Sequence, residues 1–403
     1  MNRRTLLKLV AAAALVGCGR RGNGLRIVVT GAGIVGASIA YHLAKSGAAV
    51  SVIDKQGPAT HASRGTFAWI NATWAKQPRH YHALNQDGVA SWKTLQQTLH
   101  LPARWGGSLE WFDDAERQEK LRALISEQIE WGKPARMVTA AELAALEPHV
   151  DFAGVRQAAF SANDGAVDPV AATSGLLGAA ERMGANLRYP CELTGVSLSA
   201  GRLTAVETSL GTIKADRLVL ATGAAPDAGK RFAQSDIPQR STPGVIAITA
   251  PVPRLLNRII VAPGIHMHQR EDGRIVLGEQ DGAPQNDAHA MRLAGRPNAF
   301  PTPAFARQHA DRMLAIAARF VPGIVDTVVE QVFIGWRPMP IDGHPVLGAS
   351  PTRPDVYLAV MHSGVTLAPV VGQLAGYELT EGATIDRLEE FRPGRTFEFI
   401  KRY

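Results

Sequence analysis

A glycine-rich turn between a short strand and a helix constrains the fold more than any other feature of this chain. Residues 25 to 30 form an apolar, β-branched run, the sequence GAGIVG follows at 31 to 36, and residues 37 to 46 have the apolar spacing of a helix. A second predicted strand, residues 49 to 53, ends at Asp54. This order of strand, spaced glycines, helix, strand and acid is typical of a dinucleotide-binding βαβ unit.

The glycines of this unit have geometric roles. Gly31 permits the tight turn, Gly33 lets the backbone approach a pyrophosphate, and Gly36 lets the helix pack on the strand. The phosphates then lie at the helix N-terminus, where free N–H groups and the helix dipole hold them. Asp54 stands where such a fold needs an acid for the ribose hydroxyls. The sequence therefore predicts a dinucleotide site, with an ordinary strand-turn-helix connection as the alternative.

The following part of the chain bears on which dinucleotide is bound. An NAD enzyme would continue with regular βα units, whereas residues 55 to 160 are mixed, aromatic and helical. The predicted sheet resumes later, where the Asp-Pro pair at 168 to 169 suits the cap and first turn of a helix. Residues 218 to 221 then form an apolar strand that ends in Thr-Gly at 222 to 223, which brings bare backbone close to a cofactor.

Composition limits the partners and the metal chemistry. The 403-residue chain is 46% hydrophobic and 20% charged, which is typical of a globular protein large enough for two domains. The net charge of +7 falls to +4 if cleavage before Cys18 removes Arg3, Arg4 and Lys8, which is too small to indicate a nucleic-acid partner. The two cysteines, Cys18 and Cys191, form no disulfide framework, and no His, Cys, Asp or Glu cluster has metal spacing. We expect Cys191 to be a buried thiol.

The N-terminus has the order of parts found in an export signal. Arg3 and Arg4 precede an apolar run at residues 9 to 16, which is too short to span a bilayer. The run closes with Leu-Val-Gly-Cys at 15 to 18, which resembles the lipobox of bacterial lipoproteins, and the paired arginines resemble the signal for export of folded proteins. We therefore expect residues 1 to 24 to be an export signal and a lipidated Cys18 to anchor the protein at the periplasmic side of a membrane. The alternative is a cytoplasmic protein with a basic, alanine-rich N-terminus.

Five further motifs carry a family resemblance. They are ASRGTFAWINA at 62 to 72, GAVDP at 165 to 169, LVLATGAAP at 218 to 226, GWRPMPIDGHPVLG at 335 to 348 and MHSGVTLAPVVGQLAGYEL at 361 to 379. Together with the glycine turn they resemble, in order, the FAD-dependent amine and amino-acid oxidoreductases. That family includes D-amino-acid oxidase, glycine oxidase, monomeric sarcosine oxidase and D-amino-acid dehydrogenase. The resemblance covers residues 25 to 385, with Met-His-Ser-Gly in place of the usual Gly-His-Gly of the last motif.

The resemblance implies FAD as the cofactor and an α/β fold of mixed α+β character. A Rossmann-type FAD-binding domain (residues 25 to 95, 160 to 235 and 335 to 403) is expected to interleave with a substrate domain on a mixed β-sheet (residues 96 to 159 and 236 to 334). The active site is expected between the two domains. FAD in this family is buried, so it can be inserted before a folded protein is exported, which fits the predicted signal.

The same resemblance suggests the site residues. Arg337 matches the arginine that forks onto the substrate carboxylate, with a surface ion pair as the alternative. His362 is expected either to touch flavin or substrate or simply to cap a helix whose N-terminus faces the flavin. The expected cofactor-binding residues are Gly31, Gly33, Gly36, Asp54, Lys55, Ser63, Thr222, Gly223, Ser363, Gly364, Val365 and Thr366.

The implied reaction is oxidation of the C–N bond of an amino acid or secondary amine by hydride transfer to flavin N5, with oxygen or a respiratory-chain component as the electron acceptor. Two alternatives remain at this point: a catalytically inactive, membrane-anchored flavoprotein subunit, and an NAD-linked dehydrogenase. His266 and His268 fall on one face of a predicted strand, before an Asp-Gly turn. They line the substrate cavity or form the polar face of a sheet.

Overall fold

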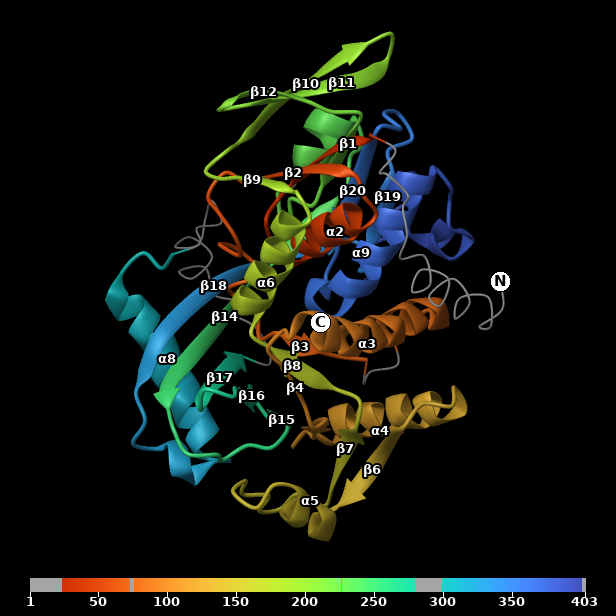
Figure 1. Ribbon diagram of the computed structural model, residues 1–403. Helices are drawn as coiled ribbons and strands as arrows, with labels where there is room; N and C mark the ends of the chain where they lie inside the picture. Colours follow the sequence, from red (N-terminus) through yellow and green to blue (C-terminus); the bar gives the residue numbers. More distant parts are fainter. Residues whose placement is uncertain (1–23, 73–75, 226, 280–298, 401–403) are drawn as a thin grey trace.

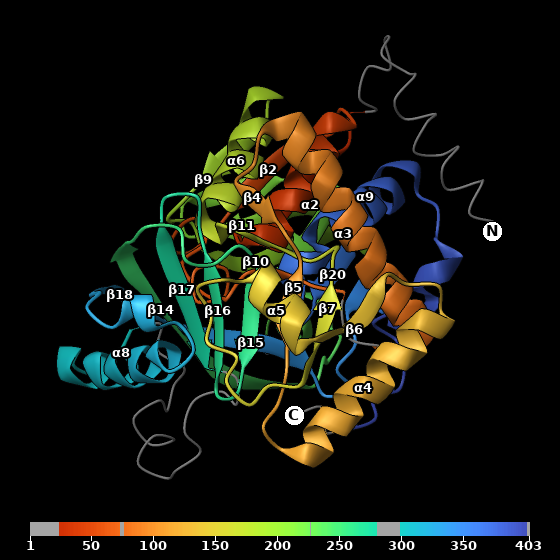
Figure 2. The same cartoon turned by 90° about the horizontal axis from the view of Figure 1, so that it is seen from below.

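The computed structural model describes residues 24–72, 76–225, 227–279 and 299–400. Within these residues the strands form two large sheets and two small ones, with helices between and around them (Figures 1 and 2). The chain is thus of the mixed α/β class that the sequence predicts. Residues 1 to 23 of the predicted export signal, Cys18 included, lie outside the described residues. No helix in the described part of the chain combines the length and apolar character needed to cross a membrane.

The first large sheet contains the glycine-turn unit. Its strand order is β19-β20-β13-β1-β2-β9; the pairs from β20 to β9 are parallel, and β19 pairs antiparallel with β20. The strands are β1 (Arg26–Thr30), β2 (Ala49–Ile53), β9 (Asn186–Arg188), β13 (Arg217–Leu220), β19 (Val346–Ala349) and β20 (Val356–Val360). The central strands β1, β13 and β20 are buried along nearly their whole length because both faces of the sheet are covered.

Helices cover one face of this sheet and a β-meander covers the other. The helices are α2 (Ile34–Lys45), α3 (Arg79–Leu99), α6 (Pro169–Arg182) and α9 (Gly364–Glu381). The Asp168 side chain caps α6 and Pro169 opens it, as the sequence predicts. The meander, which projects at the top of Figure 1, consists of β10 (Leu193–Ser199), β11 (Arg202–Thr208) and β12 (Gly211–Lys214). Cys191 is a buried free thiol beneath it, as expected.

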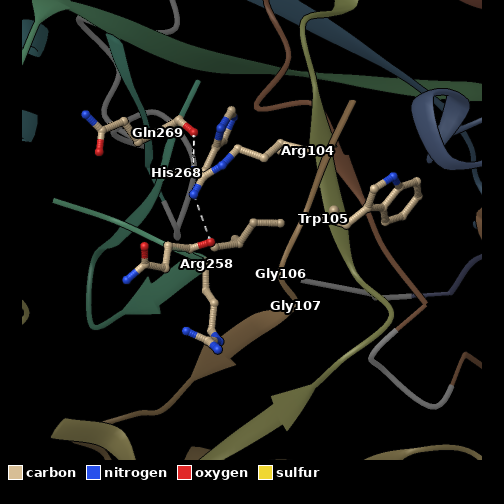
Figure 3. Close-up of a pocket in the computed structure, with 11 residues that line it drawn as sticks. Arg104, Trp105, Gly106, Gly107, Arg258, His268 and Gln269 are labelled. Carbon is tan, nitrogen blue, oxygen red and sulfur yellow. Dashed lines mark hydrogen bonds between the residues drawn. The ribbon is translucent and has the colours of Figure 1, made fainter. Parts of the chain in front are cut away.

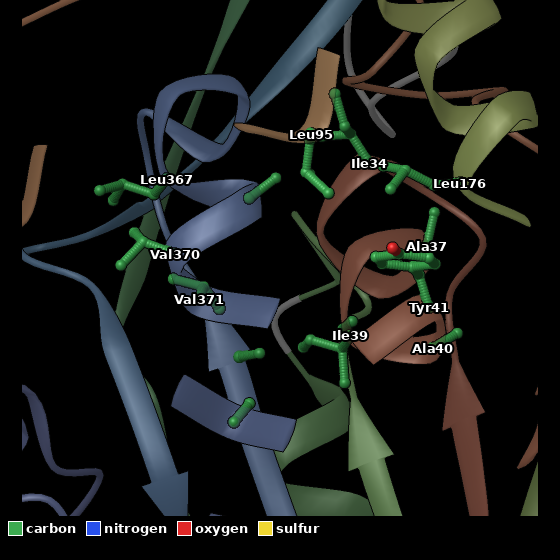
Figure 4. Close-up of a cluster of buried hydrophobic side chains, with 14 of the residues drawn as sticks. Ile34, Ala37, Ile39, Ala40, Tyr41, Leu95, Leu176, Leu367, Val370 and Val371 are labelled. Carbon is green, nitrogen blue, oxygen red and sulfur yellow. The ribbon is translucent and has the colours of Figure 1, made fainter. Parts of the chain in front are cut away.

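Helices α2 and α9 pack closely through small and branched apolar side chains (Figure 4). Gly372 of α9 meets α2 directly, since a Cβ atom at this position would lie 2.3 Å from Ser38 Oγ. Each helix follows a parallel strand of the same sheet, α2 after β1 and α9 after β20. Their N-termini therefore emerge at the same edge of the sheet.

The second large sheet has the order β18-β14-β17-β16-β15-β5-β7-β6. Its strands are β5 (Ser108–Glu110), β6 (Ala135–Thr139), β7 (Gln157–Ser161), β14 (Gln239–Pro251), β15 (Ile259–Ala262), β16 (Ile265–Gln269), β17 (Arg274–Glu279) and β18 (Val329–Pro340). Helices α5 (Ala140–Leu146) and α8 (Pro303–Ala318) pack on one of its faces. Strand β18 runs through residue 335, where the sequence placed a domain boundary.

The other face of this sheet receives the segment that follows Asp54. Phe67 and Trp69 of that segment pack on apolar residues of β14, β15 and β17. Trp69 begins strand β3 (Trp69–Ile70), which joins β8 (Gly165–Val167) and β4 (Ala103–Trp105) in a small sheet between the two large ones. The remaining elements are α4 (Ala115–Glu130), a short π-helix η1 (Gly229–Ala233), and the 3-10 helices η2 (Pro322–Ile324) and η3 (Asp386–Phe391).

Candidate active site

The predicted cofactor residues gather at one edge of the six-stranded sheet. The parallel strands β1, β2, β13 and β20 end there, and each is followed by one group of predicted residues: the glycine turn, Asp54, the Thr222-Gly223 pair and the start of α9. The carboxyl edge of a parallel sheet, where helices start, is where such folds bind ligands. Sequence positions more than three hundred residues apart are thereby brought together.

The three glycines of the turn have different structural reasons. Gly31 has φ +107°, and a Cβ atom there would lie 2.3 Å from Ala221 O. A Cβ atom at Gly36 would lie 1.9 Å from Gly31 O, so both positions exclude side chains through the chain's own packing. Gly33 has an ordinary φ of −76°, and a Cβ atom there would meet only Ser63 Oγ, at 3.1 Å. The space beside Gly33 therefore fits a cofactor pyrophosphate that passes close to the backbone.

Asp54 and Ser63 brace the glycine turn. Asp54 Oδ2 accepts a hydrogen bond from Ala32 N (2.9 Å), and Asp54 Oδ1 accepts from the backbone N–H groups of residues 56 and 57 (2.8 and 2.9 Å). Ser63 Oγ accepts from Ile34 N at 3.0 Å, in the first turn of α2. The sequence predicted a ribose contact for Asp54, which stays a prediction; the bracing role was missed. Lys55 is exposed.

The start of α9 lies against the start of α2. Ser363 has a left-handed backbone (φ +59°), and a Cβ atom on Gly364 would lie 3.3 Å from Val35 Cγ2. Two helix N-termini, each with a positive dipole end, thus adjoin the glycine turn and favour anionic groups there. His362 is half-buried, and its Nδ1 lies 3.4 Å from Ser363 Oγ.

Val365 and Thr366, both predicted to bind cofactor, also hold neighbouring segments of the chain. Val365 O accepts a 2.7 Å hydrogen bond from Trp92 Nε1 of α3. Thr366 Oγ1 accepts from Asn71 N at 3.0 Å and donates to Trp69 O at 3.2 Å. These bonds fix the segment before and within β3 to the start of α9.

Arg337 projects from β18 on the face that meets this segment. Its Nη1 donates at 3.4 Å to Thr242 Oγ1 and at 3.3 Å to Pro243 O, both long contacts. The guanidinium lies over Gly244, where a Cβ atom would be 3.0 Å from Nη2. The guanidinium can lie directly over Gly244 because this residue has no side chain.

A pair of glycines in contact links the strand of Arg337 to the edge of the six-stranded sheet where the predicted cofactor residues gather. A Cβ atom on Gly65 would lie 2.4 Å from Gly335 N, and one on Gly335 would lie 2.1 Å from Gly65 O. Gly65 is two residues from Ser63, which contacts α2, and Gly335 is two residues from Arg337. The backbone crossing thus brings the predicted substrate arginine beside the predicted cofactor residues. Neither glycine was singled out from the sequence, because a contact between such distant positions leaves no local pattern.

Asp342 shapes the turn after β18, where its Oδ1 accepts a hydrogen bond from His344 N at 3.0 Å. Its carboxylate also pairs with Arg395, at 2.8 Å between Asp342 Oδ2 and Arg395 Nε. Both side chains are largely buried, 7% and 13% exposed. The C-terminal segment therefore holds the turn that follows the Arg337 strand, a contact that sequence reasoning missed.

The two histidines of β16 flank Phe67. Its ring centroid lies 5.4 Å from that of His266 and 4.8 Å from that of His268. Burial, and after it the positive charges of Arg337 and Arg117, lower the pKa of His266 to about 3. Burial and the charge of Arg270 likewise lower the pKa of His268 to about 3. Both imidazoles are therefore neutral at physiological pH.

A small pocket lies elsewhere, between β4 and β8 on one side and β15 and β16 on the other (Figure 3). Arg104 in its wall donates to Leu256 O (3.0 Å) and Gln269 O (2.7 Å), so this guanidinium is engaged by the protein itself. No residue of the glycine turn lines it. We therefore take the Gly65–Gly335 crossing, and not this pocket, as the candidate active site. Among the described residues, no cluster of three or more His, Cys, Asp or Glu side chains is suited to a metal ion.

Comparison with known proteins gives consistent matches over most of the chain. The family model described as "FAD dependent oxidoreductase" (DAO) matches residues 26–378. Glycine oxidase of Bacillus licheniformis is 25% identical over 359 residues, covering 86% of this chain and 90% of that protein. An opine oxidase subunit of Agrobacterium tumefaciens is 25% identical over 388 residues, covering 92% and 97%. The crystal structure of L-proline dehydrogenase from P. horikoshii has a TM-score of 0.78 at 25% identity, covering 92% of this chain and 97% of that one.

Proposed function

Because the chain belongs to the DAO family of FAD-dependent oxidoreductases, we propose that it oxidises the C–N bond of an amino acid or secondary amine. The observation that supports this proposal is the Gly65–Gly335 crossing, because Gly65 is two residues from Ser63, which contacts α2, and Gly335 is two residues from Arg337. A guanidinium binds a carboxylate through two parallel hydrogen bonds, so it selects substrates that are acids. Glycine oxidase and L-proline dehydrogenase, which resemble this chain, are named for amino acids.

The chain's own residues supply binding, orientation and exclusion of water. Bound FAD supplies the hydride acceptor, flavin N5. Arg337 holds the substrate carboxylate, and Phe67 and Trp69 wall the site with aromatic surface. The N-terminus of α9 provides a positive dipole end where negative charge develops. The carbon that bears the amine loses a hydride and the nitrogen loses a proton to solvent, which leaves an imine that water hydrolyses.

An anaerobic screen with matched substrates tests this proposal. Alanine and lactate, or glycine and glycolate, share a carbon skeleton and differ in having nitrogen or oxygen on the reacting carbon. We expect the visible flavin bands to bleach with an amino acid or with sarcosine and to persist with the hydroxy acids. Bleaching by hydroxy acids alone would overturn the proposed substrate class. A flavin that no compound bleaches would instead favour the inactive flavoprotein subunit.

The electron acceptor is tested on the same reduced enzyme. We propose oxygen or a respiratory-chain component as acceptor. Mixing the bleached enzyme with oxygen gives rapid reoxidation and hydrogen peroxide if the protein is an oxidase. Slow reaction with oxygen and rapid reaction with a soluble quinone indicate a dehydrogenase. Membership of an FAD family leaves no support for the NAD-linked alternative.

We also propose that the protein is exported and anchored through a lipidated Cys18. The support is the sequence alone: paired arginines at 3 and 4, the short apolar run at residues 9 to 16, and the lipobox-like end. Replacing both arginines by lysine is expected to leave yellow, active protein in the cytosol. Cell fractionation of tagged wild type and variant checks this. Wild-type protein found wholly in the cytosol with Met1 intact contradicts export and leaves the flavoenzyme proposal unaffected.

A further inference from the structure

The two histidines of β16 are equivalent in the sequence pattern, but their surroundings differ. His268 is 3% exposed, and its Nε2 donates a 3.0 Å hydrogen bond to Phe67 O. His266 Nε2 is also buried, but it has no hydrogen-bond partner among the described residues. His266 as a whole residue is half-buried. Buried polar atoms in native proteins are nearly always hydrogen-bonded, so an unsatisfied one calls for a ligand or water.

We propose that His266 is a further substrate-binding residue, whose Nε2 hydrogen-bonds the nitrogen of a substrate that Arg337 holds by its carboxylate. This inference rests on the proposed function, because it assumes an acid that also carries an amine. It assigns the amine side of the substrate to a residue of β16 and the acid side to a residue of β18. His268 is, in contrast, a positioning residue that holds Phe67.

The strand register places both groups on the same face of the eight-stranded sheet. His266 pairs with Gly278 of β17, Gly278 pairs with Ile246 of β14, and paired residues of antiparallel strands face the same side. Thr242 is four residues from Ile246 on β14, so it shares that face, and Arg337 pairs with Thr242. The imidazole and the guanidinium therefore approach the substrate from one wall.

Aromatic rings and Gly278 define the space between these groups. The Phe67 ring lies over Gly278, where a Cβ atom would be 3.2 Å from Phe67 Cδ2. The ring of Trp69 meets His266 edge-on, at 6.1 Å between centroids and 77° between planes. The two rings hold the imidazole in place, while its Nε2 makes no bond to them. A small amino acid fits such a site better than a bulky one, because Phe67 fills the room that Gly278 leaves.

The charge state of His266 suits an amine partner. A neutral imidazole has one ring nitrogen that accepts a hydrogen bond from an N–H group. It carries no positive charge that would repel a protonated amine or add to the charge of Arg337. Arg337 supplies the positive charge that the carboxylate needs. Hydride loss requires the substrate amine in its neutral form. A neutral hydrogen-bond acceptor orients the amine but, unlike a carboxylate, adds no negative charge that would stabilise the protonated ammonium form.

A pair of unreactive ligands separates the two contacts. The probe 2-aminoisobutyrate has both a carboxylate and an amine but no α-hydrogen, so it binds without oxidation; isobutyrate lacks the amine. Titration of the FAD-loaded protein, followed by the change in the visible flavin bands, gives the affinity for each. We expect His266→Leu to weaken 2-aminoisobutyrate binding about 5-fold, as loss of one hydrogen bond implies, and to leave isobutyrate unchanged. His266→Gln, which keeps an acceptor, is expected to restore most of the loss.

His268→Gln is the matched control on the same strand and the same face. Because it acts through Phe67, it is expected to change the affinities for both probes by the same factor. A second readout uses protein labelled with [15N]histidine: the Nε2 resonance of His266 is expected to shift with 2-aminoisobutyrate and to stay in place with isobutyrate. Thermal melting of each variant shows whether the fold is retained.

The outcomes separate this inference from the proposed function. Equal discrimination between the two probes in wild type and His266→Leu overturns the role of His266, even if Arg337 matters. Failure of wild type to bind 2-aminoisobutyrate where isobutyrate binds overturns it as well. If Arg337→Lys leaves the affinities for both probes unchanged, the acid-binding site itself is wrong, and the proposed function fails with it.

Discussion

Replacement of Arg337 by lysine gives the most direct test of the active-site assignment. The two contacts of its guanidinium with β14, to Thr242 Oγ1 and Pro243 O, are 3.4 and 3.3 Å long, at the weak end of hydrogen bonding. A lysine keeps the charge and loses the two-pronged geometry that matches a carboxylate.

The expected magnitude follows from the bonds lost to the substrate. Hydrogen bonds to charged groups contribute roughly 1.5 to 3 kcal/mol, and about 1.4 kcal/mol corresponds to a factor of ten. We expect Arg337→Lys to weaken the apparent binding of a carboxylated substrate about 10- to 100-fold. The limiting rate of flavin bleaching at saturation is expected to change much less. Anaerobic stopped-flow titration of flavin bleaching yields both quantities.

Two controls make this prediction specific. An amine without a carboxylate is expected to bleach the flavin of wild type and variant with the same concentration dependence. Gly244→Ala should weaken acid binding in the same direction, because its Cβ atom would lie 3.0 Å from Arg337 Nη2 and must move the flexible guanidinium. Unchanged affinity for the best acid in Arg337→Lys would refute the reasoning and make Arg337 a structural residue.

Three further predictions follow from the packing and charges. Gly33→Val is expected to fold without FAD, since the cofactor and not the protein needs that space. Gly36→Val is expected not to fold, because its Cβ atom would meet Gly31 O. Flavin absorbance measures the FAD content of the purified variants, and circular dichroism shows whether they are folded. Burial lowers the pKa of three histidines to about 3: His42, His266 and His268. Below pH 6.5 the unfolded chain therefore binds more protons than the folded one. The free energy of unfolding measured in urea is expected to fall as the pH drops from 6.5 toward 3, by up to about 1.4 kcal/mol per pH unit for each histidine. His268→Gln should flatten this slope, and a free energy of unfolding that does not change with pH contradicts the assignment. Asp342→Asn is expected to cost about 3 kcal/mol in urea unfolding, because it leaves Arg395 largely buried without its carboxylate; a cost below about 1 kcal/mol, comparable with that of Asp272→Asn at an exposed ion pair, contradicts it.

Local patterns in the sequence were enough to predict the elements that carry the cofactor site. Strand β2 begins and ends where the sequence predicts it, at residues 49 and 53. The Asp-Pro pair at 168 to 169 opens α6. The strand that ends before the Thr222-Gly223 pair is β13. These predictions succeed because capping, turn formation and hydrophobic periodicity depend on neighbours within a few residues.

The sequence also indicated the family. The motifs at the glycine turn, in β18 and at the start of α9 follow one another in the order typical of that family, and a single sequence is enough to read this order. It also assigned a separate role to each of Gly31, Gly33 and Gly36. The structure adds which atoms a side chain would meet: backbone oxygens at Gly31 and Gly36, and only Ser63 Oγ at Gly33. That distinction depends on where residues such as Ala221 and Ser63 come to lie.

Only the tertiary structure decided how the active site is assembled. The crossing of Gly65 over Gly335 brings the strand of Arg337 against the segment that contains Ser63, and the pairing of Asp342 with Arg395 holds the turn after β18. The same packing gives the Nε2 of His268 a carbonyl partner and leaves the Nε2 of His266 without one among the described residues. Contacts between segments far apart in the chain depend on how whole sheets pack against each other, and neither periodicity nor turn chemistry records that arrangement.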